Sequence, residues 1–179
     1  MEDSELLQKI RTSDTKEYGF NLLIRKYQQK IYWHIRRMVV DHQDADDLVQ
    51  ETFIKVYKNI LSFREDSQLY TWIYRIATNV CLSFLKKKKR MFFIPLINLS
   101  DDLLTKLQES ELVTGDIIQQ KLYKATLRLP DKQRLVFNLK YFDNLKYEEM
   151  AEITGTSVGA LKASYHHAVK KIEEFIAED

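Results

Sequence analysis

Three consecutive apolar patterns with helical spacing fill the first half of the sequence, and they restrict this half to an all-helical fold. Apolar residues recur there every three or four positions, which places them on one face of an α-helix. The patterns cover residues 20–38, 45–60 and 69–89, and few residues that break helices interrupt them, since the 179-residue chain has 4 Gly and 2 Pro. Amphipathic helices of this kind bury their apolar faces against one another, so we expect a small helical bundle.

The second half is also helical in pattern but is divided into shorter segments. Pro130 suits the first position of a helix, Asp143 and Asn144 mark a turn, and a short helical pattern ends at Gly155. Between the halves, residues 91–117 lose the helical pattern at Pro95 and turn acidic. We therefore predict an all-α fold of two small helical domains, residues 1–90 and 118–179, joined by a flexible linker at 91–117.

Several classes of protein do not fit this sequence. The single cysteine, Cys81, excludes an internal disulfide and suits a reducing compartment. No apolar run approaches the ~20 residues of a membrane-spanning helix. The acidic start "MEDSELLQKI" lacks the apolar core of a secretory signal. The apolar stretch "MFFIPLINL" after the basic residues 86–90 resembles a membrane-surface anchor in composition, but Pro95 interrupts it, which favours a packed linker. We expect a cytoplasmic protein without membrane insertion.

The charge of the chain is unevenly distributed between its halves. Residues 1–95 carry 17 Lys and Arg against 12 Asp and Glu, a balance of +5, whereas residues 96–179 carry 11 against 14, a balance of −3. A basic half suggests a polyanionic partner. On total charge alone, an ordinary solvated surface is the simpler explanation.

The segment 151–172 has the pattern of a helix-turn-helix. The small Ala151 suits a close helix approach, Gly155 a left-handed turn, and Thr156 or Ser157 the cap of a second helix, which Leu161 anchors. The second helix carries small side chains, hydrogen-bond donors and cations on its outer face, as base-edge readers and phosphate contacts require. This face comprises Ser157, Lys162, Ala163, Ser164, His166, His167, Lys170 and Lys171. Many helical hairpins share the pattern, so DNA binding and plain packing both remain open.

A second stripe on the third helix has the composition of a single-strand binding surface. An aromatic ring stacks on an unpaired base, an amide bonds a base edge and cations hold the backbone. The candidates are Arg64 in the preceding polar loop, Trp72, Arg75 and Asn79 on the helix, and Lys86 and Lys87 in the basic run. The alternative places Trp72 and Tyr74 in the core and the lysines in solvent. That alternative is the stronger one for Tyr74.

The outer face of the second helix combines acidic, amide and apolar side chains: Asp47, Gln50, Glu51 and Ile54. One exposed isoleucine usually carries no function. Within an acidic patch, however, it is typical of a protein interface.

Three of these segments occur in the order found in one known family. "DADDLVQETFIKVYKNI", "TWIYRIATNVCLSFLKKKKR" and "LPDKQRLVFNLKYFDNLKYEEMAEITGTSVGALKASYHHAVKKI" together resemble bacterial sigma factors. The short two-domain form is similar to the extracytoplasmic-function (ECF) group. The resemblance covers about residues 10–90 and 118–176.

The resemblance implies a transcription initiation factor without catalytic residues, metal or cofactor. Asp47, Gln50, Glu51 and Ile54 would bind the clamp of the largest subunit of core RNA polymerase. The N-terminal domain would melt the downstream −10 box and capture it as single-stranded DNA, with Asn79 at the family position that faces a flipped-out base. The last helix would read the upstream −35 box as double-stranded DNA, and the linker would thread through the polymerase. An anti-sigma factor is a further candidate partner.

The sequence departs from the family on its last helix. The family often has arginines at the positions of Ser164 and His167, so this helix carries fewer permanent cations. Histidine is mostly neutral near pH 7. The departure implies weaker upstream binding or a different preferred sequence.

Three other functions remain to be compared with a sigma factor. A stand-alone helix-turn-helix regulator uses only the last helices, and it leaves Trp72, Asn79 and the acidic helix without a role. An enzyme is disfavoured because the sequence has no Gly-rich phosphate loop, zinc-type Cys/His spacing or plausible Ser–His–Asp set, and because neighbouring His166 and His167 point in different directions on a helix. A purely structural scaffold does not account for three ordered motifs.

Overall fold

The computed structural model describes residues 1–91 and 117–178, and every regular element in these ranges is helical. The prediction of an all-α fold is confirmed. The N-terminal half contains α1 (Asp3–Arg11), η1 (Ser13–Thr15), α2 (Lys16–Val39), α3 (His42–Asn59), η2 (Ile60–Ser62) and α4 (Leu69–Met91). The C-terminal half contains α6 (Ile117–Leu127), α7 (Asp131–Tyr141), α8 (Tyr147–Thr154) and α9 (Val158–Glu178). The predicted linker lies outside the described residues except at its two edges.

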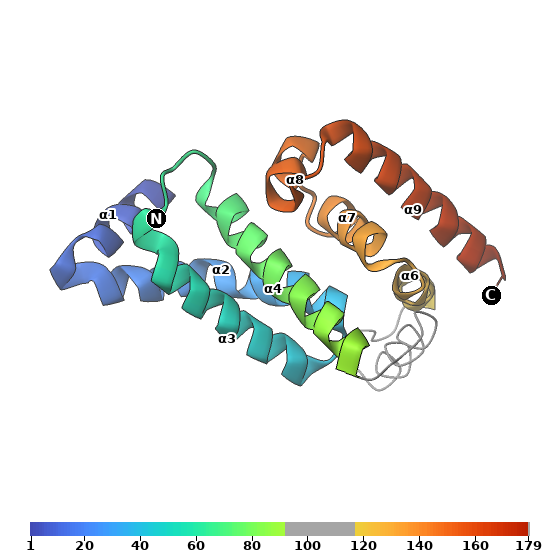
Figure 1. Cartoon of the computed structure of the whole chain (residues 1–179), viewed down its shortest axis with the longest axis horizontal. Helices are drawn as coiled ribbons and strands as arrows, with labels where there is room; N and C mark the ends of the chain where they lie inside the picture. Colours follow the sequence, from blue (N-terminus) through green and yellow to red (C-terminus); the bar gives the residue numbers. More distant parts are fainter. Residues whose placement is uncertain (92–116, 179) are drawn as a thin grey trace.

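Helices α2, α3 and α4 form the predicted bundle and bury the apolar faces read from the sequence (Figure 1). The buried side chains include Phe20, Leu23, Tyr27, Ile31, Ile35, Met38, Ala45, Leu48, Phe53, Val56, Ile60, Ile73, Ala77 and Val80. Helix α3 begins after Asp41, whose carboxylate accepts a hydrogen bond of 2.9 Å from the amide of Asp44. Such a cap satisfies a backbone donor that the first turn leaves unpaired.

Helix α1 was not foreseen from the sequence, and it packs closely on α2. It buries Leu6, Leu7 and Ile10. The approach depends on Gly19, because a Cβ atom there would lie 2.9 Å from Cβ of Lys9 and 3.0 Å from the amide nitrogen of Ile10. A side chain at position 19 would therefore push α1 away from α2.

The C-terminal half has a small core of its own, formed by Ala125, Leu129, Phe137, Ala168 and Ile172. Helix α8 ends at Thr154, and Gly155, which follows it, adopts the predicted left-handed conformation with φ of 67°. The Ser157 hydroxyl accepts a hydrogen bond of 3.3 Å from the amide of Ala160. Of the two predicted cap residues, Ser157 therefore caps α9.

The two halves pack against each other and share their main core. Helix α4 contacts α3 on one side and α8 on the other, and α2 contacts α7, so α4 lies between α3 and the C-terminal helices (Figure 1). Side chains of α7, α8 and α9 join the core of the N-terminal half, among them Leu135, Leu139, Met150, Ile153 and Leu161. The sequence did not predict this packing. Within residues 1–91 and 117–178, no helix has the length and apolar character needed to cross a membrane.

Candidate nucleic-acid interface

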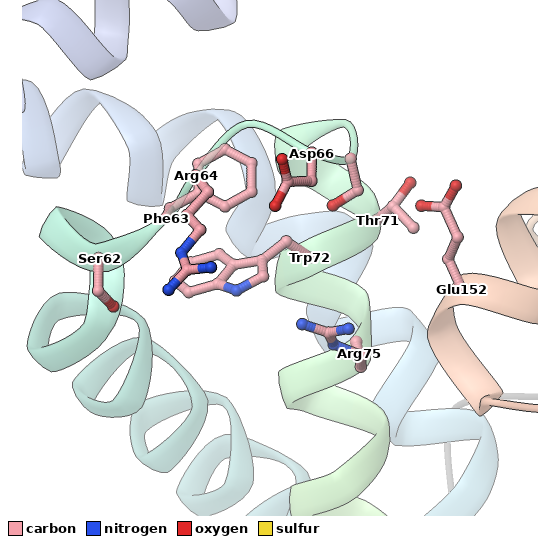
Figure 2. Close-up of a pocket in the computed structure, with 9 residues that line it drawn as sticks. Ser62, Phe63, Arg64, Asp66, Thr71, Trp72, Arg75 and Glu152 are labelled. Atoms are coloured by element: carbon pink, nitrogen blue, oxygen red, sulfur yellow. The ribbon is translucent and has the colours of Figure 1, made fainter.

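A cavity of about 420 Å³ opens where the loop after η2 meets the first turns of α4. One wall is aromatic, because the rings of Phe63 and Trp72 lie 5.1 Å apart with their planes tilted by 39°. The polar lining comes from Ser62, Arg64, Asp66, Ser67, Thr71 and Arg75, and from Glu152 of α8 (Figure 2). The predicted residues Arg64, Trp72 and Arg75 therefore meet at one cavity. Sequence reasoning missed Glu152, because it reaches the cavity only through the packing of the two halves.

The predicted stripe on α4 lies open along the helix. Trp72 is half-buried, whereas Arg75 and Asn79 are exposed at steps of three and four residues. Tyr74 is buried, as the alternative interpretation held. Its burial raises the pKa of its phenol above the ordinary value. The exposed stripe therefore presents an aromatic ring, a guanidinium and an amide side by side.

The basic run at the end of α4 divides into two groups. Lys86 and Lys87 are exposed. Lys88 pairs with Asp44 at 3.1 Å, and Lys89 pairs with Asp131 of α7 at 2.5 Å. The two lysines predicted to hold a DNA backbone are thus the two that face solvent.

The outer face of α9 is accessible at most predicted positions. Ser157, Lys162, Ala163, His166, His167 and Lys170 are exposed, and Ser164 and Lys171 are half-buried. The Lys162 ammonium lies 5.6 Å from the ring centroid of Tyr147. Lys171 donates a hydrogen bond of 3.0 Å to Oε1 of Gln133. Lys170 is therefore better placed than Lys171 for a phosphate contact.

The outer face of α3 is a separate surface on the N-terminal half. Asp47, Gln50, Glu51 and Ile54 are exposed, as expected, and the Ile54 side chain shows 54% of its surface. Tyr57 and Leu61 extend this apolar strip beyond the predicted residues. Leu61 could have been found from its seven-residue spacing to Ile54, whereas Tyr57 falls within the apolar pattern of residues 45–60 and was therefore expected in the core.

The described part of the chain contains a single thiol, that of Cys81, and it is buried. No group of three or more His, Cys, Asp and Glu side chains among the described residues is placed to hold a metal ion. Burial raises the pKa of Cys81 to about 12, so its nucleophilic thiolate is scarce near neutral pH.

Comparisons with known proteins match the two halves of the chain to two regions of one family. Residues 23–91 match the family model of Sigma-70 region 2, and residues 119–172 match Sigma-70, region 4. The RNA polymerase sigma-H factor of Pseudomonas aeruginosa is 31% identical over 97% of this chain and 93% of its own length. The ECF RNA polymerase sigma-E factor of Escherichia coli K12 is 33% identical over 96% and 92%.

Two solved structures share the fold. One is the sigma factor RpoE in complex with the anti-sigma factor NepR from Bartonella quintana, with a TM-score of 0.69 and 22% identity over 89% of this chain and 98% of that one. The other is CnrH in complex with the cytosolic domain of CnrY, with a TM-score of 0.70 and 20% identity over 97% and 96%. Two matched regions in the expected order, together with relatives of nearly equal length, show that the chain belongs to the ECF group of the sigma-70 family of RNA polymerase sigma factors.

Proposed function

We propose that this sigma factor directs RNA polymerase to promoters through three separate surfaces. The outer face of α3 binds the clamp of the core enzyme. The cavity at the start of α4 and the stripe beside it melt the −10 box and hold it as a single strand. The outer face of α9 reads the −35 box. The observation that carries the proposal is the aromatic cavity beside exposed Arg75 and Asn79.

The cavity has the properties that a flipped-out base requires. An extruded base is held by stacking and by hydrogen bonds to its edge, which offset the few kcal/mol lost on unstacking. Phe63 and Trp72 supply an aromatic wall, and the Thr71 hydroxyl and Arg75 supply polar groups. Asn79 lies two turns along α4 from Trp72 and is exposed to an approaching strand. Lys86 and Lys87 extend this surface toward the C-terminal end of α4 and add positive charge to it.

Helix α9 supports recognition of duplex DNA by its exposure and its composition. Lys162 and His166 are one turn apart in its first half and reach base edges, whereas Lys170 lies further along and holds a phosphate. Ser157, at the N-terminus of α9, is placed for a backbone phosphate, because helix N-termini attract anions.

The polymerase-binding role of α3 is supported by its strip of exposed apolar side chains. Ile54, Tyr57 and Leu61 face solvent beside Asp47, Gln50 and Glu51. A partly apolar patch with a polar rim is typical of a protein interface. A stand-alone regulator has no use for this strip or for the cavity.

The two DNA-binding surfaces must move apart on a promoter. The names −10 and −35 place the boxes about 25 base pairs apart, which is about 85 Å along B-DNA. A packed chain of 179 residues has a radius of gyration of only about 16 Å. The packed arrangement of α4 against α8 therefore belongs to the free protein, and the halves separate in the promoter complex.

We assign no catalytic residue, cofactor or metal to the protein, and we place it in the cytoplasm with the polymerase. An anti-sigma factor is a proposed further partner, supported by the structural neighbour RpoE, which was co-crystallised with the anti-sigma factor NepR. The promoter sequence is to be identified by run-off transcription with purified core polymerase on a genomic fragment library.

Asn79→Ala tests the single-strand surface on the promoter so identified. Permanganate footprinting is expected to show loss of melting in the −10 box, from the ~1–3 kcal/mol of a lost base contact, while closed-complex binding persists. Asn21→Ala, the same change at an exposed position of α2, is the control. Normal melting with Asn79→Ala would exclude this role for the residue.

A further inference from the structure

We propose that Arg11 of α1 is a positioning residue, which holds the loop of residues 63–68 in the conformation that keeps the cavity open to a flipped-out base. This inference rests on the proposed single-strand function of the cavity. Helix α1 precedes the segment matched to Sigma-70 region 2, which begins at residue 23. The matched family regions therefore assign it no role.

The Arg11 guanidinium joins two points of the loop that are far from it in sequence. Its Nη2 atom donates a hydrogen bond of 3.2 Å to the carbonyl oxygen of Phe63, 52 positions away. Its Nη1 atom lies 2.6 Å from Oε1 of Glu65. The planar guanidinium presents its donors in a fixed fork, so one side chain fixes a backbone carbonyl and a carboxylate relative to each other.

The loop of residues 63–68 depends on contacts from other parts of the chain, because it has no regular secondary structure to hold its conformation. The side chains of Arg64, Glu65 and Asp66 are exposed, and these residues belong to no helix, because they lie between the end of η2 and the start of α4. Glu65 has a positive φ of 62°, a conformation that a residue with a Cβ atom rarely adopts. Such a backbone persists when surrounding contacts hold it, and the two contacts of Arg11 fall on Glu65 itself and two residues before it.

A movement of this loop changes the cavity directly. Phe63 carries the carbonyl that Arg11 binds, and its ring forms the aromatic wall with Trp72. Arg64 and Asp66, on either side of Glu65, also line the cavity. The Arg11 contacts therefore act on the residues that would enclose a base.

Contacts with α2 fix helix α1 to the bundle, and they therefore fix the position of Arg11. Asp3 accepts hydrogen bonds of 2.7 Å from Nζ of Lys26 and from the hydroxyl of Tyr27, both on α2. The helix also buries Leu6, Leu7 and Ile10 and approaches α2 at Gly19. The position of the loop is thus set relative to α2 through α1.

The contribution of Arg11 to global stability is expected to be small, which separates positioning from plain structural support. The side chains of Arg11 and Glu65 are 44% and 48% exposed. Ion pairs exposed to this extent contribute little to folding. A loss of DNA binding without a loss of stability would therefore come from the shape of the cavity.

The test measures binding of holoenzyme to a promoter fork whose −10 strand is single-stranded, with the strand intact or with an abasic site at each −10 position in turn. Arg11→Ala is expected to weaken binding of the intact strand about fivefold, and to have an effect below about twofold on the strand that lacks the captured base. Arg11→Lys keeps the charge but cannot hold both contacts, so we expect it to behave like Arg11→Ala. The control is Arg25→Ala, an exposed arginine of α2, whose effect is expected to be the same on both strands.

A second variant reaches the loop without touching Arg11. Gly19→Ala introduces a Cβ atom that collides with Lys9 and Ile10, and it therefore displaces α1. Gly19→Ala is therefore expected to weaken binding of the intact strand more than binding of the strand that lacks the captured base. It is also expected to lower the melting temperature. Arg11→Ala is expected to melt within about 2 °C of the unmodified protein.

Two results would overturn the proposal: the first excludes only the role of Arg11, and the second also excludes the proposed function of the cavity. Equal weakening by Arg11→Ala on intact and abasic strands would mean that Arg11 acts through the DNA backbone or the whole fold. If unmodified holoenzyme binds every abasic strand as tightly as the intact one, the cavity captures no base, and the proposed function of the cavity fails together with this inference.

Discussion

The carboxylate of Asp143 accepts a hydrogen bond of 2.7 Å from Nη1 of Arg37, although 106 positions separate the two residues. Its other oxygen lies 3.3 Å from Nδ1 of His34, and Nε2 of that histidine lies 3.0 Å from the Thr78 hydroxyl. The Asp143 side chain is only 6% exposed. The predicted turn between α7 and α8 therefore inserts a carboxylate into the N-terminal bundle and ties the two halves together.

Removing this carboxylate is expected to loosen the packing of the halves. Asp143→Ala leaves a nearly buried guanidinium and a buried imidazole without their acidic partner, which typically costs about 3 kcal/mol. We expect a lower free energy of unfolding and a longer distance between fluorophores attached to α1 and α9. Asp14→Ala, an exposed acid of η1, is the control. An unchanged distance would mean that the shared apolar core alone holds the halves together.

The outer face of α3 gives a prediction about polymerase binding. Glu51→Lys combined with Ile54→Asp reverses a charge and removes the apolar centre of the exposed strip, so co-purification with core polymerase should be lost. Both side chains face solvent, and circular dichroism should therefore show unchanged helicity. Glu173→Lys, an exposed change on α9, provides the comparison. Full binding by the folded double variant would place the interface elsewhere.

Helix α9 gives a prediction that separates phosphate contacts from base contacts. Lys170→Ala should lower the slope of log affinity against log salt by about one unit and leave sequence preference unchanged, because a phosphate contact carries no sequence information. Lys162→Ala should instead alter the preferred −35 sequence. Lys171→Ala should change the slope less than Lys170→Ala, since Lys171 already bonds Gln133.

Selection from randomised upstream boxes measures the preference of each variant, and titration at several salt concentrations gives the slopes. If Lys162→Ala and His166→Ala both keep the original preference, a different face of α9, or a different helix, reads the DNA. None of these changes should affect melting of the −10 box once the complex has formed.

Buried groups that lose protons in alkali predict how stability depends on pH. Burial raises the pKa of Cys81 to about 12 from its ordinary value of 9.0, and burial together with the hydrogen bond to the Glu149 carboxylate raises the pKa of Tyr70 to about 12 from 10.0. At pH 8 and below, these groups keep nearly all their protons in the folded and the unfolded chain. Above pH 8 the unfolded chain loses protons first, so the free energy of unfolding should fall as pH rises toward 12.

Urea unfolding at pH 8 and pH 10.5 measures this fall. The buried thiol alone should account for about 2 kcal/mol at pH 10.5. Cys81→Ala should reduce the pH dependence by about that amount, whatever the substitution costs at pH 8. An identical pH dependence in the variant would show that the thiol is not protected in the folded protein.

The helical faces of the bundle and of α9 were predictable because their contacts repeat with the period of the helix. Ile31 and Ile35, or Leu161 and Ala168, reveal their common side without knowledge of any partner. The exposed stripe of Trp72, Arg75 and Asn79 was predictable for the same reason. Helix α1 was missed because its pattern is short and its close approach to α2 depends on a single glycine, Gly19.

The packing of the halves could not be read from the sequence, because it depends on pairs that no local pattern connects. Asp143 has the appearance of a turn residue, and Lys88 and Lys89 have the appearance of solvated charges. Their partners Arg37, Asp44 and Asp131 become evident only when distant helices lie together. For the same reason, Glu152 was not foreseen as part of the cavity.

The shared core has a kinetic consequence for assembly with the polymerase. Leu139, Met150 and Ile153 pack with side chains of the N-terminal bundle, and the proposed separation of the halves on a promoter breaks those contacts. An opening step that precedes capture by the core enzyme is first-order and does not accelerate with polymerase concentration. The rate of holoenzyme formation should therefore level off as core polymerase is increased, and the plateau should report how often the free sigma factor opens.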